Sequence, residues 1–356
     1  VEDGAKIYNG ADGGFNMTAK EAQLNVNLAQ SFAKGKTFAI GGTVLYAGHT
    51  GDTMARLGKT VEVTGRNARI FAGSLGTTAT WAGGIAAGES LGIGISVAIN
   101  DIDRTTRALI GDVDANAGTT VSGNKYFDVD ELVQAKALVS GDVWAFTIAG
   151  AAVSPDSDDT SGKTDKAPAK NPTNGKTQPN PLGGASGVVK GQQAATEGDQ
   201  TGIALAAAAS INLISDNTTA RIADAGQVHA GSVKVLASNE VSLIAATGGL
   251  AVASVDSGNT SAALAGAFSF NELTADTSAE VQDTDFSLSG NAAGEDTLTV
   301  QAEVSGEIFS LAAGGAGAKA SGGDGTGTGD STAVAVAGSV SINEISGETT
   351  ATFLNS

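Results

Sequence analysis

The sequence predicts an all-β protein, a parallel β-helix solenoid built of about five degenerate repeats. Three observations carry this prediction. One phrase of fourteen residues recurs five times, with its last copy at residues 339–352. Short segments of small residues alternate with a period of two before and after each copy. All five prolines fall in a single stretch, which leaves the rest of the chain free to form continuous backbone ladders. A repeat with a fixed spacing is one structural unit that stacks on the next.

The recurring phrase has three fixed positions. It contains an asparagine, a threonine six residues later and an alanine eight residues later, and the degenerate first copy has Ala47 in place of the asparagine. We expect the asparagines and threonines to form a structural ladder, with the amides hydrogen-bonded from coil to coil inside a turn. The residues of this predicted ladder are Asn100, Asn212, Asn271, Asn343, Thr106, Thr218, Thr277 and Thr349, with Thr53 in the degenerate copy. Ala47 argues against an obligatory catalytic role for the asparagine.

Strands are predicted on both sides of each phrase. The alternating segments that precede it are 92–99, 203–211, 261–270 and 332–342, and those that follow it include 61–64, 228–237, 241–254 and 298–302. Residues 18–34 have a composition that suits a helix, but their alignment with 233–252 favours a strand. Each repeat is thus expected to hold several short strands joined by Gly, Asn and Asp turns. Equivalent positions lie 53 to 72 residues apart outside one long interval, which predicts two or three coils per repeat, each of roughly 20 to 30 residues.

The long interval predicts the domain organisation. Asn100 and Asn212 are 112 residues apart, and the extra residues are rich in Pro, Ser and Asp. We expect residues 1–152 to form repeats 1 and 2, residues 153–200 a flexible inserted loop, and residues 201–356 repeats 3 to 5 of the same continuous solenoid. The chain starts without a signal peptide and ends within a repeat, so we also expect it to be a segment of a longer chain.

Composition limits the partners. The net charge is −18, which would repel a phosphate backbone, so we expect no nucleic-acid partner. The chain has no cysteine, which excludes disulfides and thiolate metal sites and fits an exported bacterial protein. No stretch reaches the roughly eighteen consecutive apolar residues of a membrane helix, so we expect a chain that is not membrane-spanning.

Few residues suggest chemistry, and we assign no catalytic and no cofactor-binding residue. The glycine-rich stretch 322–330 is a poor match to calcium-binding nonapeptides, because Gly327 takes the position of an aspartate. His49 and His229 are expected to be exposed turn or strand residues. No metal site is expected, and calcium is left open as a cofactor. Its weak candidate ligands are Asp156, Asp158, Asp159, Asp324 and Asp330.

An enzyme remains the alternative to this non-enzymatic interpretation. β-Helical polysaccharide lyases and hydrolases use clusters of Asp or Glu on one face. Carboxylates from different coils can meet there although their sequence spacing hides it. Such an enzyme would show a groove lined by acids.

Residues 94–110, with the related segments 205–222, 265–281 and 336–353, resemble the repeats of very large bacterial exported proteins. These are the leukotoxin-like filamentous adhesins and the haemagglutinin-type surface proteins. The resemblance implies a right-handed β-helical shaft, an extracellular or cell-surface location, and attachment to host cells, surface ligands or other copies of the same fibre. We therefore expect a structural or adhesive segment of a secreted bacterial filament. A part of a large exported cytotoxin is a further alternative that the resemblance implies.

Overall fold

The computed structural model describes residues 1–10, 12–59, 61–111, 126–154, 201–255, 260–290, 297–320 and 331–354, with the side chain of Tyr126 left out. These residues form β-strands and contain no helix. Hence no described segment is a helix of the length and apolarity needed to cross a bilayer. The strands are β1 (Lys6–Tyr8), β2 (Gly14–Gly35), β3 (Phe38–Leu57), β4 (Glu62–Gly88), β5 (Leu91–Gly111), β6 (Tyr126–Val153), β7 (Thr201–Val255), β8 (Thr260–Leu288), β9 (Thr297–Ala320), β10 (Thr332–Ser346) and β11 (Thr349–Leu354).

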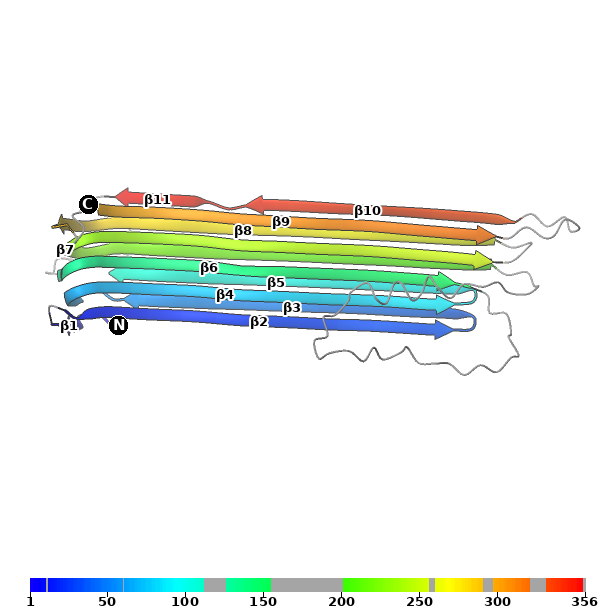
Figure 1. The fold of residues 1–356 in the computed structure, drawn as a ribbon, viewed down its shortest axis with the longest axis horizontal. Coiled ribbons are helices and arrows are strands. Elements are labelled where there is room, and N and C mark those ends of the chain that lie inside the picture. Colours follow the sequence, from blue (N-terminus) through cyan, green and yellow to red (C-terminus); the bar gives the residue numbers. More distant parts are fainter. Residues whose placement is uncertain are drawn as a thin grey trace, which may run out of the picture.

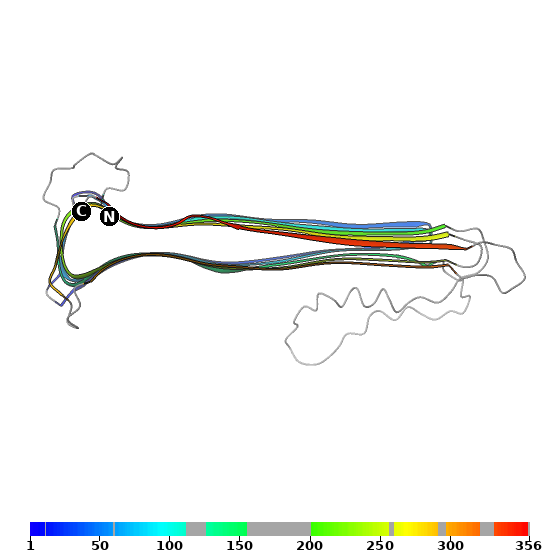
Figure 2. The same cartoon turned by 90° about the horizontal axis from the view of Figure 1, so that it is seen from above.

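The strands stack as a flattened solenoid of two facing layers (Figures 1 and 2). One layer contains β2, β4, β6, the second part of β7, and β9. The other contains β3, β5, the first part of β7, β8, and then β10 and β11. Every pairing is parallel, because each strand lies beside its equivalent in the next coil. The predicted all-β parallel solenoid is confirmed.

Each repeat forms one coil, so the prediction of two or three coils per repeat is wrong. Asn100 pairs directly with Asn212, Asn212 with Asn271, and Asn271 with Asn343. A repeat interval tells how far apart equivalent residues lie but not how often the chain turns between them. Here the strands are long, 20 to 29 residues in β3 and β8, and two such strands with one short connecting segment complete a turn of the solenoid.

The expectation of short strands joined by turns inside the phrase is also wrong. The phrase lies within one uninterrupted strand in β3, β5, β7 and β8, and its asparagine is a mid-strand residue. The last copy is interrupted, at residues 347–348 between β10 and β11, where Gly347 has a φ of 141°. Gly and Asn signal turns in isolated strands, but in a solenoid they also serve positions that face the opposite layer.

Residues 18–34 lie in β2, so the strand prediction for this segment is confirmed. Its register follows the expected alignment, because Thr18 stacks on Phe71, Phe71 on Lys136 and Lys136 on Leu236. The predicted inserted loop falls between β6 and β7, and residues 155–200 lie outside the described part of the chain. β6 and the first part of β7 belong to the same stack of coils on either side of it.

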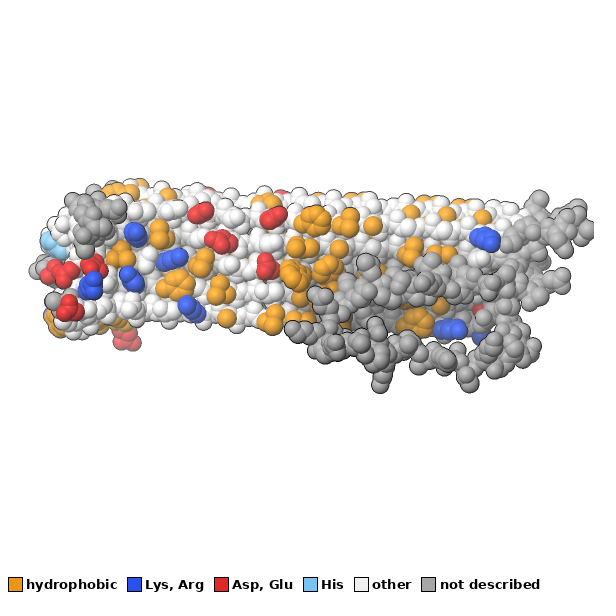
Figure 3. Space-filling model, viewed as in Figure 1, with side chains coloured by type: hydrophobic (Ala, Val, Ile, Leu, Met, Phe, Trp, Pro, Cys, Tyr) orange, Lys and Arg blue, Asp and Glu red, His pale blue; other side chains and the backbone are white. Residues whose placement is uncertain are grey.

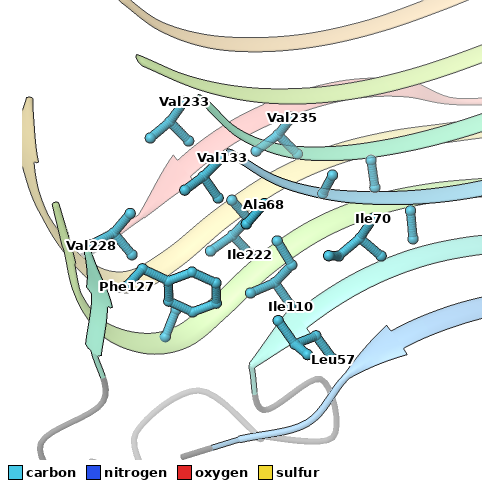
Figure 4. Packing of buried hydrophobic residues seen from close by; sticks show 14 of the residues in the cluster. Leu57, Ala68, Ile70, Ile110, Phe127, Val133, Ile222, Val228, Val233 and Val235 are labelled. Carbon is cyan, nitrogen blue, oxygen red and sulfur yellow. The ribbon is translucent and has the colours of Figure 1, made fainter. Parts of the chain in front are cut away.

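The asparagine level divides each coil into two halves with different cores. The half nearer β1, which we call the closed half, has a core of large aliphatic side chains such as Leu57, Ile70, Ile110 and Ile222 (Figure 4). The two layers lie farther apart at the end of this half and are joined there by the short strand β1 and its neighbours (Figure 2). Its outer surface carries the charged side chains that gather on the face seen in Figure 3.

The other half of each coil we call the apolar half. It comprises residues 26–47, 79–100, 144–154, 201–212, 244–255, 260–271, 309–320 and 331–343. Between its layers lie alanines and glycines, for example Ala149, Ala204, Ala251 and Ala263. At Gly249 an added Cβ would overlap the backbone of Gly266 on the facing strand, so the two backbones are in contact there.

Large apolar side chains of the apolar half point outward instead. On the layer of β3, the alternate outward-facing positions within 38–46, 91–99, 203–211, 262–270 and 334–342 are all apolar or glycine. On the opposite layer the same holds for alternate positions within 26–34, 79–87, 144–152, 244–252 and 309–317, with Gln30 and Lys34 as the exceptions. We call these two surfaces together the apolar band. Figure 3 shows hydrophobic side chains continuing beyond the charged part of the face in view.

The two ends of the stack differ. At the last coil, Ile345 and Phe353 continue interior rows that contain Leu273 and Val281, yet they are 54% and 47% exposed because no further coil covers them. At the first coil, the interior positions of β2 are polar over residues 21–27, with Glu21, Gln23, Asn25 and Asn27.

Candidate functional site: the polar ladder between the layers

A row of asparagine amides runs through the interior along the stack. Asn100 Nδ2 donates to Asn212 Oδ1 at 2.6 Å, Asn212 Nδ2 to Asn271 Oδ1 at 2.6 Å, and Asn271 Nδ2 to Asn343 Oδ1 at 2.7 Å. Asn100, Asn212 and Asn271 are fully buried. The structure thus brings together the four predicted ladder asparagines. They bond side chain to side chain in mid-strand, and not within a turn as expected.

Hydroxyl groups complete the hydrogen bonds of the ladder. Asn212 Nδ2 also donates to Ser210 Oγ at 3.1 Å, and Asn271 Nδ2 to Ser269 Oγ at 3.0 Å. Partners come from the facing layer as well, since Thr80 donates to Asn100 Oδ1 and Ser310 Oγ lies 2.9 Å from Asn271 Nδ2. A buried amide is costly unless its donors and acceptors are satisfied, and a satisfied network fixes the register of the groups it joins. The ladder therefore sets the register of the coils and of the two layers.

The threonine row behaves differently from the asparagine row. Thr53, Thr106, Thr218, Thr277 and Thr349 stack in register on the interior side of the same strands. Within the described residues, the buried hydroxyls of Thr106, Thr218 and Thr277 have no hydrogen-bond partner. The row therefore contributes β-branched packing on a pleated surface rather than a second hydrogen-bonded ladder.

A buried ion pair lies near the ladder in the closed half. Arg104 Nε is 2.7 Å from Asp216 Oδ1 and Arg104 Nη2 is 2.8 Å from Asp216 Oδ2, with both side chains at most 4% exposed. Gly76 on the facing layer leaves room for the guanidinium, since a Cβ there would lie 3.4 Å from Arg104 Nη1. Sequence reasoning missed this pair. The sequence did contain a signal for it. Arg104 and Asp216 each lie four residues after a ladder asparagine, so they occupy the same position in successive coils.

The first coil has a polar cluster in place of the missing ladder asparagine. Glu21 accepts from Thr53 Oγ1 at 3.0 Å and lies 3.2 Å from His49 Nε2. An added Cβ on Gly51 would lie 2.6 Å from a Glu21 carboxylate oxygen, so glycine makes space for this group. His49 lies in β3, so it is the strand residue that was one of the two expectations, but its side chain is only 14% exposed and the expected exposure is wrong. Thr53 Oγ1 donates to the carboxylate of Glu21 and not to the imidazole of His49. Because Thr53 lies on β3 and Glu21 on β2, this hydrogen bond joins the two layers.

Two surface ion pairs and one hydrogen bond shift pKa values. The Lys6 ammonium, 2.8 Å from Glu62, lowers the pKa of that carboxyl through a hydrogen bond, and Glu62 raises the pKa of Lys6. Arg66 lowers the pKa of Glu131 in the same way. Tyr46 donates to Asp101 at 3.0 Å, which raises the pKa of the phenol. All of these groups lie on the exterior, the two ion pairs near β1 and the Tyr46–Asp101 pair on the outer face beside the ladder position.

The candidate calcium ligands Asp156, Asp158, Asp159, Asp324 and Asp330 all lie outside the described residues. In the part of the chain that is described, three or more His, Cys, Asp or Glu residues nowhere gather as a metal site would require. His229 lies in β7, half-buried. A shallow, open hollow of about 480 Å³ lies on the apolar band, between residues such as Ile95, Ala207 and Phe268.

Comparison with known proteins identifies no relative. No protein-family model, curated protein or solved structure matches the chain.

Proposed function

We propose that the chain is a non-enzymatic structural segment of a secreted or cell-surface bacterial β-helical filament, in which it forms part of a stiff stalk or extracellular fibre. The observation that carries this proposal is the in-register stacking of equivalent residues, in which Asn100, Asn212, Asn271 and Asn343 follow one another through successive coils. Ile345 and Phe353 continue the interior rows of Leu273 and Val281 into the last described coil. A stack of this kind lengthens by the addition of further coils, whether from the same chain or from another copy.

The partner in the proposed fibre is another copy or segment of the same solenoid. If the first coil of a second copy stacks on the last coil in the register of the existing coils, its Ala47 follows Asn343 and its β2 follows β9. Asn27 belongs to the same row as Thr80 and Ser310, which both bond ladder asparagines. The second copy would therefore bring Asn27 to Asn343 at the position that Ser310 has beside Asn271. Length then grows with the number of coils at constant cross-section, as a stalk requires.

The acidic, cysteine-free composition supports an extracellular place for this filament. A net charge of −18 keeps exposed surfaces soluble and separates neighbouring fibres. The absence of cysteine frees the chain from dependence on disulfide formation after export. The resemblance of the repeated phrase to exported bacterial adhesins points the same way.

Assembly of the purified chain tests the proposal. We expect fibres of constant width by electron microscopy, with the roughly 4.7–4.8 Å repeat of stacked strands along the fibre axis. Replacing Ile345 and Phe353 together by Lys should leave single solenoids in sedimentation velocity, because charges at the interior edge cannot be buried by another coil. Ser346→Lys is the matched control, since Ser346 neighbours Ile345 but lies on the outer face. A wild-type chain that stays monomeric at high concentration would refute stacking between copies.

A further inference from the structure

The apolar band is a surface of unusual kind, because it covers both outer faces of the same half of the molecule. Among its side chains, Leu264, Trp144 and Ile95 are 49%, 42% and 42% exposed. Soluble proteins seldom expose contiguous apolar patches larger than a few hundred Å², and larger ones mark interaction sites. A surface of this kind on two opposite faces needs an occupant that surrounds the apolar half.

The length of the band matches the interior of a lipid bilayer. On the layer of β3 it spans residues 91–99 of β5 and their equivalents, and on the other layer residues 79–87 of β4 and theirs. About nine residues at roughly 3.3 Å each extend close to 30 Å, which is the thickness of the hydrocarbon core. Both layers therefore present an apolar stretch of the same length, at about the same level along the strands.

Charges and aromatic residues mark the borders of the band. On the side of the closed half, Asp101 and Glu272 take the next outward position after the last apolar one of their strands, and Asp142 takes the outward position before Trp144. Tyr46, Trp81 and Trp144 lie at this border, and Trp81 stacks on Phe146 with ring centroids 5.6 Å apart. Lys34, Lys36 and Glu89 lie at the opposite border, near the turns between the layers. Trp and Tyr are typical of the interface between a bilayer and water, and charged residues lie outside the hydrocarbon.

The interior of the apolar half suits the same environment. The backbone groups of its inner strands are paired in the parallel ladders, and its core consists mainly of Ala and Gly, with the buried hydroxyls of Ser96, Thr147, Thr247 and Ser261 as its small polar groups. Hydrocarbon accepts a strand only when its backbone hydrogen bonds are made within the protein. The strand edges at the two ends of the stack require a neighbouring coil for this, and in that respect the inference rests on the proposed stacking.

A lipid environment explains the band better than a second copy packed on its face. If one copy packed on each face, the outer apolar faces of those copies would still be exposed. The association would therefore continue without limit. Copies packed side by side in the same orientation would also bring Asp101, Glu272 and Glu344 of one copy against the same acidic residues of the next. These like charges would repel each other. Acyl chains cover both faces at once and bring no charge.

We propose that the apolar half is embedded in a lipid bilayer with its strands roughly along the membrane normal, while the closed half lies in water. The filament would then be an upright wall of coils held in a membrane along its length. The expectation of a chain that is not membrane-spanning considered helices, and this arrangement uses strands. The apolar half would contact the uncharged acyl chains of the lipid. Binding to an anionic membrane surface is not expected, because the net charge of −18 would oppose it.

The two tryptophans of the chain give a direct readout, because Trp81 and Trp144 both lie on the apolar band. The full chain is mixed with phosphatidylcholine vesicles and floated on a density gradient. We expect it to float with the vesicles and its tryptophan emission to shift to shorter wavelength. Quenching should be stronger with spin labels near the headgroup than with labels at the chain ends, because both indoles lie at the border of the band. A chain that does not float and whose emission does not shift overturns the proposal.

Two lysine substitutions in one strand provide the matched comparison. Leu205 and Ser215 lie on the outer face of β7 on opposite sides of Asn212, in the apolar half and the closed half respectively. Leu205→Lys should weaken partition into vesicles about 30-fold or more, the cost of a lysine deep in hydrocarbon, and Ser215→Lys should leave it unchanged. Circular dichroism checks that both variants keep their strands. Equal flotation of Leu205→Lys and Ser215→Lys would overturn the proposal.

The same variants separate this inference from the proposed stacking. Leu205→Lys should still form fibres in lipid-free buffer, whereas the Ile345 and Phe353 double lysine variant should lose both fibres and flotation. If Leu205→Lys abolishes association between copies in lipid-free buffer, and the wild type does not bind vesicles, the band is an interface between copies and the bilayer proposal fails.

Discussion

The two halves of each coil follow the same alternation along the strand but bury opposite residues. In the closed half, large aliphatic residues such as Ile222 and Leu243 face inward and charged residues face outward. In the apolar half, Ala204 and Ala206 face inward, and Leu205 lies between them on the outer face. Alternation shows that a strand has two faces, but side-chain volume decides how far apart two layers can lie. The comparison teaches that the spacing of the layers, and not hydrophobicity alone, determines which face is the core.

The largest expected effect concerns the buried ion pair of the closed half. Asp216→Ala should lower the free energy of unfolding by about 3–5 kcal/mol, because it leaves the Arg104 guanidinium buried without a counter-charge. Urea denaturation followed by circular dichroism measures the change. Replacing Arg104 by Met and Asp216 by Leu together should recover most of the loss. A loss below about 1 kcal/mol for Asp216→Ala would show that Arg104 finds water or another partner.

The tight spacing of the apolar half is tested by two glycines that face each other. Gly249→Ala should lower the free energy of unfolding by about 1–3 kcal/mol, since its Cβ would press on the backbone of Gly266 and force the layers apart. Gly266→Ala is the control, because its own Cβ would have no heavy atom within 4 Å. Alanine there should be neutral or stabilising by up to about 1 kcal/mol. Thermal and urea unfolding of the two variants would contradict the tight spacing if they were equally stable.

The ladder at the border between the halves should give the next effect. Asn212→Ala removes the amide that joins Asn100 to Asn271 and leaves one buried donor and one buried acceptor unsatisfied. We expect a loss of about 1–3 kcal/mol in the free energy of unfolding. Asn343→Ala, at the exposed end of the row, should cost less because water can replace the missing amide. Equal losses at both positions would argue that burial does not govern the strength of the ladder.

The sequence was sufficient for the fold class and for the columns of the ladder. Recurrence places Asn100, Asn212 and Asn271 in equivalent positions, and parallel stacking then brings them into contact. It was not sufficient for the size of the coil, because the Gly and Asn residues within the phrase also occur in turns. Nor did it indicate which face of the apolar half lies inside, since Ile93 and Gly94 fit either assignment until the facing layer is placed. The Arg104–Asp216 pair was hidden because each charge occurs in only one copy of its column.

The smallest effect is expected from the exterior ion pairs near β1. The pKa values of Glu62 and Glu131 are lowered in the folded protein by Lys6 and Arg66, so both carboxylates hold their protons less tightly than in the unfolded chain. Their contribution to stability is present above the unfolded pKa near 4.5 and is lost as the pH falls through the lower folded values.

Melting temperatures measured between pH 7 and pH 3 should therefore fall on acidification, and the Lys6→Gln and Arg66→Gln double variant should lose less across this range than the wild type. Because these groups are exposed, salt should reduce the difference, whereas the buried Arg104–Asp216 pair should respond little to salt. An acid-induced loss of the same size in the variant would place the titrating carboxylates elsewhere on the closed half. The contrast between a salt-sensitive exterior and a salt-insensitive interior would then still separate the surface of that half from its core.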